Sequence, residues 1–96
     1  MIVVGVCRVV LALHGNSSLK GKRSVVRRVV DRTRHKFNVA ISEVEDQDEH
    51  GHAVIAFSVV GNEKPHVNSR IDTILNFMDG ISEAPIAESD MEILSW

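Results

Sequence analysis

The chain has no tyrosine, one tryptophan and one cysteine, and it has no long uninterrupted apolar run. A single cysteine excludes an internal disulfide and is typical of a reducing compartment. No apolar run approaches the ~20 residues that a membrane-spanning helix needs. The apolar start does not predict a signal peptide, because Arg8 interrupts it, no positive segment precedes it and no small-residue cleavage site follows. We therefore expect a cytoplasmic protein with no membrane segment.

The sequence also lacks the motifs that carry catalysis or cofactor binding. It contains no glycine-rich phosphate loop. The only nucleophile–base pairings available are Ser17 or Ser18 with His14, and Cys7 with any histidine. Cys7 lies in the middle of an apolar, strand-like segment, which favours an inert buried thiol. We expect a protein that is not an enzyme, with no catalytic residue and no cofactor.

Acids and imidazoles gather in one short segment, residues 43–52. Asp46, Asp48, His50 and His52 carry side chains that could ligate a divalent ion. However, their spacing matches no known metal site, and the polar tip of a hairpin has the same composition. The sequence therefore assigns no metal, and a metal site remains the alternative interpretation of this segment.

The hydrophobic pattern predicts one domain that covers residues 1–96. Strands alternate with helices of 3.6-residue periodicity, in the order strand, helix, strand, strand, helix, strand. The predicted elements are residues 2–13, 19–37, 39–45, 52–60, 63–79 and 88–94. Two β-α-β halves with right-handed crossovers give an α+β, ferredoxin-like β-α-β-β-α-β fold, a four-stranded antiparallel sheet with two helices on one face.

The first predicted helix gathers most of the positive charge. It carries eight Lys or Arg and a single acid, Asp31, a local charge of +7, while the rest of the chain sums to −9. Like charges four residues apart, such as Arg23 and Arg27, destabilise a helix. Their clustering therefore favours contact with the phosphates of a nucleic acid. The candidate nucleic-acid-binding residues are Lys20, Arg23, Arg27, Arg28, Arg32, Arg34 and Lys36.

Two other interpretations of this helix remain open. Its charges could be balanced by acids of the same chain or of a dimer partner, or the helix could dock an acidic protein. Base stacking on the sheet, as in many RNA-binding domains of this topology, is not supported, because strand segment HAVIAFSVV lacks the glycine and aromatic pattern of that mode. Any RNA contact is expected to be directed at the backbone.

The first and third strands are apolar on both faces, although the two helices can cover only one. An uncovered apolar sheet face is rare on a monomer. We therefore expect a homodimer formed through the open sheet face or a sheet edge. The candidate interface residues are Ile2, Val4, Val6, Val54, Ala56 and Val60. The alternative is that loops and residues 93–96 fold over this face.

The segments SLKGKRSVV and RHKFNVAISEVEDQD resemble the YlxP-like family, small bacterial proteins catalogued as a domain of unknown function. The similarity extends from IVVGVCRV to the EIL near the end, and departs at EHGH, where relatives often carry a tryptophan-containing segment. It implies a ferredoxin-like fold and, from a gene neighbourhood of transcription, translation-initiation and ribosome-maturation factors, RNA or a ribosomal subunit as partner. The residues that match are Ser18, Leu19, Lys20, Lys22, Arg23, Ser24, Phe37, Asn38, Glu43 and Asp46.

Overall fold

The computed structural model describes residues 1–96 and has the predicted order of elements. Alternation of β-branched residues gives the strands, and apolar residues at helical spacing give the two helices. The elements are β1 (Val3–Ala12), α1 (Leu19–Lys36), β2 (Ala40–Val44), β3 (His52–Gly61), α2 (Lys64–Ile81) and β4 (Ile86–Ser95).

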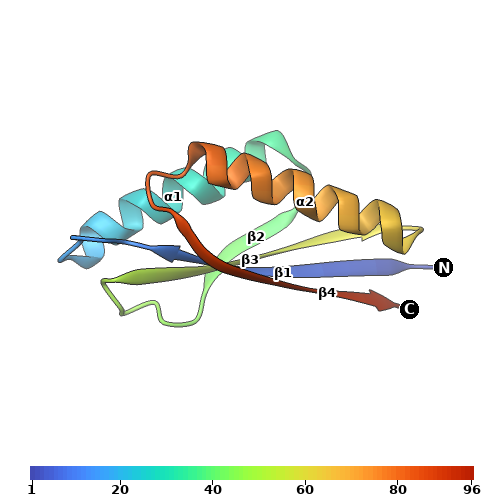
Figure 1. Cartoon of the computed structure of the whole chain (residues 1–96), viewed down its shortest axis with the longest axis horizontal. Helices are drawn as coiled ribbons and strands as arrows, with labels where there is room; N and C mark the ends of the chain where they lie inside the picture. The colour runs from blue at the N-terminus through green and yellow to red at the C-terminus, as the bar shows by residue number, and fades with distance from the viewer.

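The four strands form one antiparallel sheet in the order β2-β3-β1-β4. Both helices lie on the same face of this sheet, and the two chain ends lie side by side (Figure 1). Ile2 and Trp96 exchange backbone hydrogen bonds of 3.1 and 2.7 Å, which extends the β1–β4 pairing beyond the strands themselves. The predicted α+β, ferredoxin-like architecture is confirmed.

The core lies between the sheet and the two helices. Alternate residues of β1, among them Cys7 and Val9, point toward the helices and are fully buried. Gly5 lies where α2 approaches the strand most closely, because a Cβ there would come within 2.5 Å of Ile71 Cδ1 and 2.6 Å of Val67 Cγ1. The absence of a side chain at Gly5 therefore allows α2 to pack directly against β1.

The N-cap residue of helix α1 is Ser18. The Ser18 hydroxyl accepts a hydrogen bond of 3.1 Å from the Gly21 amide. The helix ends at Phe37, whose backbone is extended. The next residue, Asn38, is not in a left-handed conformation, because the only positive φ angles are at Gly15, Glu45 and Asp46.

Helix α2 is longer than the sequence predicts. It runs through Gly80 to Ile81 and ends at Ser82, whose amide donates to the Met78 carbonyl. Glu63 is the N-cap residue, and its side chain makes no cap hydrogen bond. Neither helix is long and apolar enough to cross a membrane.

The face of the sheet opposite the helices is divided into two halves. At one end the β2–β3 loop lies beneath the sheet (Figure 1), and a 2.7 Å ion pair between Arg8 and Glu45 fastens the loop to β1. Val54, which pairs with Val44 on one side and Val10 on the other, is fully buried at this end. The prediction that Val54 belongs to an exposed patch is therefore wrong.

The other half of this face remains open and apolar. Of the remaining predicted interface residues, Val4 and Ala56 are half-buried, whereas Ile2, Val6 and Val60 are exposed, Val60 to 64%. Leu94 lies beside Val4 on β4 and is also exposed. The open-face patch consists of Ile2, Val4, Val6, Val60 and Leu94.

Candidate nucleic-acid interface

Helix α1 turns its charged residues away from the sheet, because Val26, Val29 and Thr33 on its opposite side are buried against the core. No carboxylate of the chain lies within 4.0 Å of the charged groups of six of these residues. These six form the basic tract: Lys20, Arg23, Arg27, Arg28, Arg32 and Lys36. Their positive charge is therefore available to another molecule.

Two hollows lie along the basic tract. The first, of about 560 Å³, is lined by Lys20, Arg23, Ser24, Arg27, Arg28 and Asp31. The second, of about 690 Å³, lies between α1 and α2 and is lined by Asp31, Arg32, His35, Lys36 and Phe77. Asp31 borders both hollows, so they adjoin and follow the helix from its first turn to its last.

Arg34 differs from the other predicted binding residues because its guanidinium is already engaged within the chain. It donates a 2.8 Å hydrogen bond to the carbonyl of Ile41 in β2, and it lies 3.6 Å from the Asp31 carboxylate. The backbone group that it contacts belongs to the outer strand of the sheet. We therefore assign Arg34 to the protection of the β2 edge rather than to the basic tract.

Lys22 is the one basic residue of α1 that is buried, with 1% of its surface exposed. Its ammonium group donates to the backbone carbonyls of Asp46, Gln47 and Glu49 at 2.7, 3.3 and 2.8 Å, and lies 3.2 Å from a Glu43 carboxylate oxygen. The side chain therefore holds the β2–β3 loop against the first turns of α1. Its position near the buried stripe was the only sequence signal of this role.

The β2–β3 loop brings together two of the four residues weighed as metal ligands. The His52 ring lies 3.0 Å from the Asp46 carboxylate, and this hydrogen bond lowers the pKa of Asp46. Asp48 and His50 do not join them, and no cluster of three or more metal-ligating side chains is formed. The loop thus has a paired imidazole and carboxylate, but no third ligand for an ion.

Two of the three candidate nucleophiles, Ser18 and Cys7, have other roles. Ser18 caps α1, and Cys7 is fully buried in the core. Burial, followed by the negative charge of Asp72 and Asp90, raises the pKa of the Cys7 thiol from 9.0 to about 11. A protonated thiol without access to solvent is a poor nucleophile.

Comparison with known proteins supports the sequence resemblance. The family model described as "Protein of unknown function (DUF503)" matches residues 4–91. The "Uncharacterized protein YlxP" of Bacillus subtilis (strain 168) is 28% identical over 81 residues, which are 84% of this chain and 88% of the Bacillus protein.

The solved structures that resemble this chain share its fold at low sequence identity. The de novo designed protein LFR1 1, which has a ferredoxin fold, superposes with a TM-score of 0.57 at 16% identity, over 100% of this chain and 88% of the designed one. The flavoenzyme CrmK matches 98% of this chain with a TM-score of 0.61 at 13% identity, but over only 20% of its own length. A designed protein and part of an enzyme thus share this backbone, which by itself indicates no activity. The family-model match over residues 4–91 shows that the chain belongs to the DUF503 family, in which the Bacillus relative is named YlxP.

Proposed function

We propose that this chain is a non-enzymatic, cytoplasmic RNA- or ribosome-associated protein that contacts phosphates through helix α1. The observation that carries the proposal is the basic tract, six cationic side chains without an acidic partner in a chain of net charge −2. A helix gains nothing in stability from such a tract, because like charges four residues apart repel. Binding to a polyanion recovers that cost through the release of condensed counterions.

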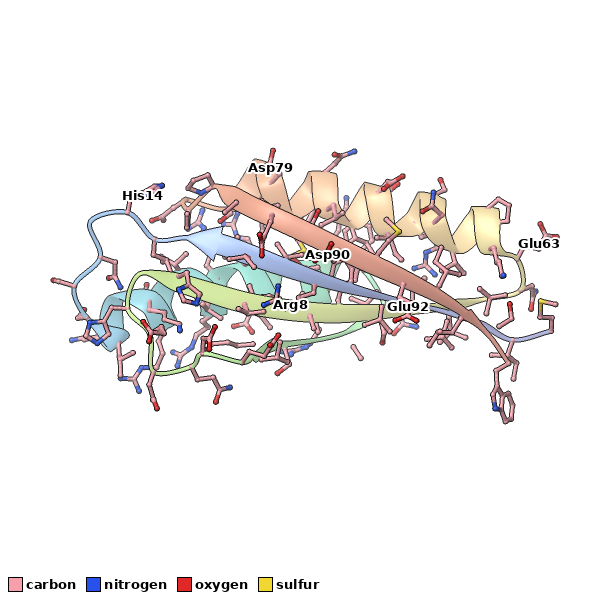
Figure 2. All side chains as sticks on the ribbon, turned by 60° about the horizontal axis from the view of Figure 1, so that its bottom comes forward. Arg8, His14, Glu63, Asp79, Asp90 and Glu92 are labelled. Carbon is pink, nitrogen blue, oxygen red and sulfur yellow. The ribbon has the colours of Figure 1, made fainter.

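The distribution of acids on the molecule supports the same assignment. Figure 2 shows Arg8, Asp90 and Glu92 on the face of the sheet opposite the helices. Glu88 of β4 lies on that face too, 3.6 Å from Arg8. The three acids of β4 therefore lie on the opposite side of the sheet from the basic tract and do not pair with it.

A charge-reversal experiment tests the proposal. Fluorescence anisotropy would measure binding of a 12-nucleotide single-stranded RNA to the wild-type chain and to the variant Arg23→Glu/Arg27→Glu. The matched control is Lys64→Glu/Arg70→Glu, which changes the net charge by the same four units on α2, outside the tract. We expect the tract variant to lose at least tenfold in affinity and the control to lose much less, since only the tract contacts phosphates directly.

Equal losses in both variants would contradict the proposal, because they would indicate a non-specific response to net charge. The alternative function, docking of an acidic protein, predicts a different result in cell extracts. Association through RNA disappears after nuclease treatment, whereas a complex with an acidic protein survives it. If a complex resists nuclease and is abolished by Arg23→Glu/Arg27→Glu, the partner of the basic tract is a protein and not RNA.

We further propose that the chain forms a homodimer through the open-face patch. The patch lies on the opposite side of the sheet from α1, so a second copy would cover it and leave both basic tracts free. Pairing of two β4 edges is disfavoured, because antiparallel pairing about Asp90 would place Glu88 of one copy opposite Glu92 of the other. The face is therefore the better route to self-association.

Sedimentation analysis tests the dimer directly. Val60 is largely exposed, so Val60→Asp should leave the fold intact while introducing a charge into the patch. We expect the wild-type chain to sediment as a dimer and Val60→Asp as a monomer. A monomeric wild-type chain at high micromolar concentration would contradict the dimer and leave the RNA proposal untouched.

A further inference from the structure

The hollow between α1 and α2 differs from the rest of the tract because it contains an aromatic ring. Three of its lining residues, Arg32, His35 and Lys36, come from the last turns of α1. Phe77 comes from α2 and supplies the apolar wall. The other hollow on this helix is lined only by polar and charged residues.

Phe77 lies outside the buried stripe of α2 and remains half-exposed. Its ring meets Phe37 edge to face, with centroids 5.4 Å apart and planes inclined at 84°. Such a contact covers at most one face of either ring, so at least one face of the Phe77 ring is not covered by Phe37. Phe37 itself does not line the hollow.

The charges around Phe77 are suited to a nucleotide. Arg32 and Lys36 have no acidic partner in the chain, and both belong to the basic tract. The carboxylate of Asp31, at 3.6 Å from Arg34, adds a hydrogen-bond acceptor to the lining of the hollow. A phosphate can therefore lie against the cations while the attached base meets the aromatic ring and the acceptor.

We propose that this hollow binds an unpaired nucleobase of single-stranded RNA, stacked on Phe77, with the neighbouring phosphates on Arg32 and Lys36. The inference rests on the proposed function and narrows it to single-stranded RNA, because a base within a duplex is stacked and paired and cannot enter the hollow. The remaining phosphates follow the tract toward Lys20. From Lys20 to Lys36 the helix extends about 24 Å.

Two leucine substitutions test the proposal. Phe77→Leu keeps an apolar side chain but removes the aromatic face, and Phe37→Leu is the matched control that breaks the same ring–ring contact outside the hollow. Binding would be measured with the 12-nucleotide single strand and with the same strand annealed to its complement. We expect Phe77→Leu to weaken single-strand binding about tenfold and to leave duplex binding unchanged. We expect Phe37→Leu to change neither.

A fluorescent reporter gives a second, independent readout. The variant Phe77→Trp/Trp96→Phe places the only indole of the chain at the hollow, and a stacked base should quench its emission as single-stranded RNA is added. Equal effects of the two leucine variants, or saturable binding of the single strand without quenching, would overturn the stacking site while the proposed function stands. Failure of the wild-type chain to bind either form of RNA would instead overturn the proposed function itself.

Discussion

Replacing the buried lysine Lys22 by methionine should destabilise the fold more than any other change of a charged residue in α1. The substitution keeps a long apolar stem but removes the ammonium group that three loop carbonyls and Glu43 contact. Loss of one partner from a buried ion pair costs 3–5 kcal/mol. Because 19% of the Glu43 side chain is exposed to solvent, we expect Lys22→Met to lower the unfolding free energy by about 3 kcal/mol, the lower end of this range. A domain of this size has a total unfolding free energy of roughly 5–14 kcal/mol.

Urea denaturation measures this cost. With a slope of about 1.5 kcal/mol per molar urea, a loss of 3 kcal/mol lowers the midpoint by about 2 M. The control Lys20→Met removes the same charge from the exposed face of the same helix turn, and it should change stability by less than about 0.5 kcal/mol.

A second variant separates the ion pair from the carbonyl contacts. Adding Glu43→Gln to Lys22→Met removes the uncompensated carboxylate and should recover part of the lost stability, because neighbouring sites couple. If Lys22→Met and Lys20→Met have the same midpoint, the buried lysine does not hold the loop and this part of the reasoning is refuted.

Three further predictions concern Cys7, Gly5 and Gly80. Because the pKa of Cys7 is raised from 9.0 to about 11, its contribution to stability is fully present below pH 9 and is lost as the pH rises through 11. The unfolding free energy of the wild-type chain should therefore fall over this interval more steeply than that of Cys7→Ala. At pH 8 the Cys7 thiol should react with an alkylating reagent only when the chain unfolds. Gly5→Ala should destabilise the chain by about 1–3 kcal/mol, because its methyl group meets Ile71. Gly80→Ala, in open space within α2, should stabilise it by about 0.5–1 kcal/mol, and equal effects of the two alanines in thermal unfolding would contradict both assignments.

The fold could be predicted from the sequence because its signals are local. Alternating β-branched residues in β1 and β3 and the helical spacing of buried residues in α1 each specify an element without reference to the others. The end of α2 could not be predicted, since Gly80 carries a helix-stop signal that the structure does not use. The helix continues to Ile81, and the Ser82 hydroxyl organises the next turn by bonding both backbone groups of Ala84.

Only part of the candidate site could be predicted from the sequence. The charges of α1 are explicit in its residues, and their lack of acidic partners is what the structure adds. The course of the β2–β3 loop was hidden, because it depends on left-handed conformations at Glu45 and Asp46, residues that give no glycine signal. For this reason both the burial of Val54 and the bonds of Lys22 to the loop escaped prediction. Phe77 gave one signal, its position off the buried stripe of α2, but its place beside Arg32 depends on how the two helices pack.

The salt dependence of RNA binding by the wild-type chain tests the central claim most directly. Each phosphate contact with a single strand contributes about −0.7 to the slope of log affinity against log salt concentration, so six contacts predict a slope of about −4. In Arg23→Glu/Arg27→Glu the loss of two contacts should bring the slope to about −3. Slopes near those values are the result that the account predicts. An affinity that does not change between low and high salt would show that the cations of α1 do not contact phosphates.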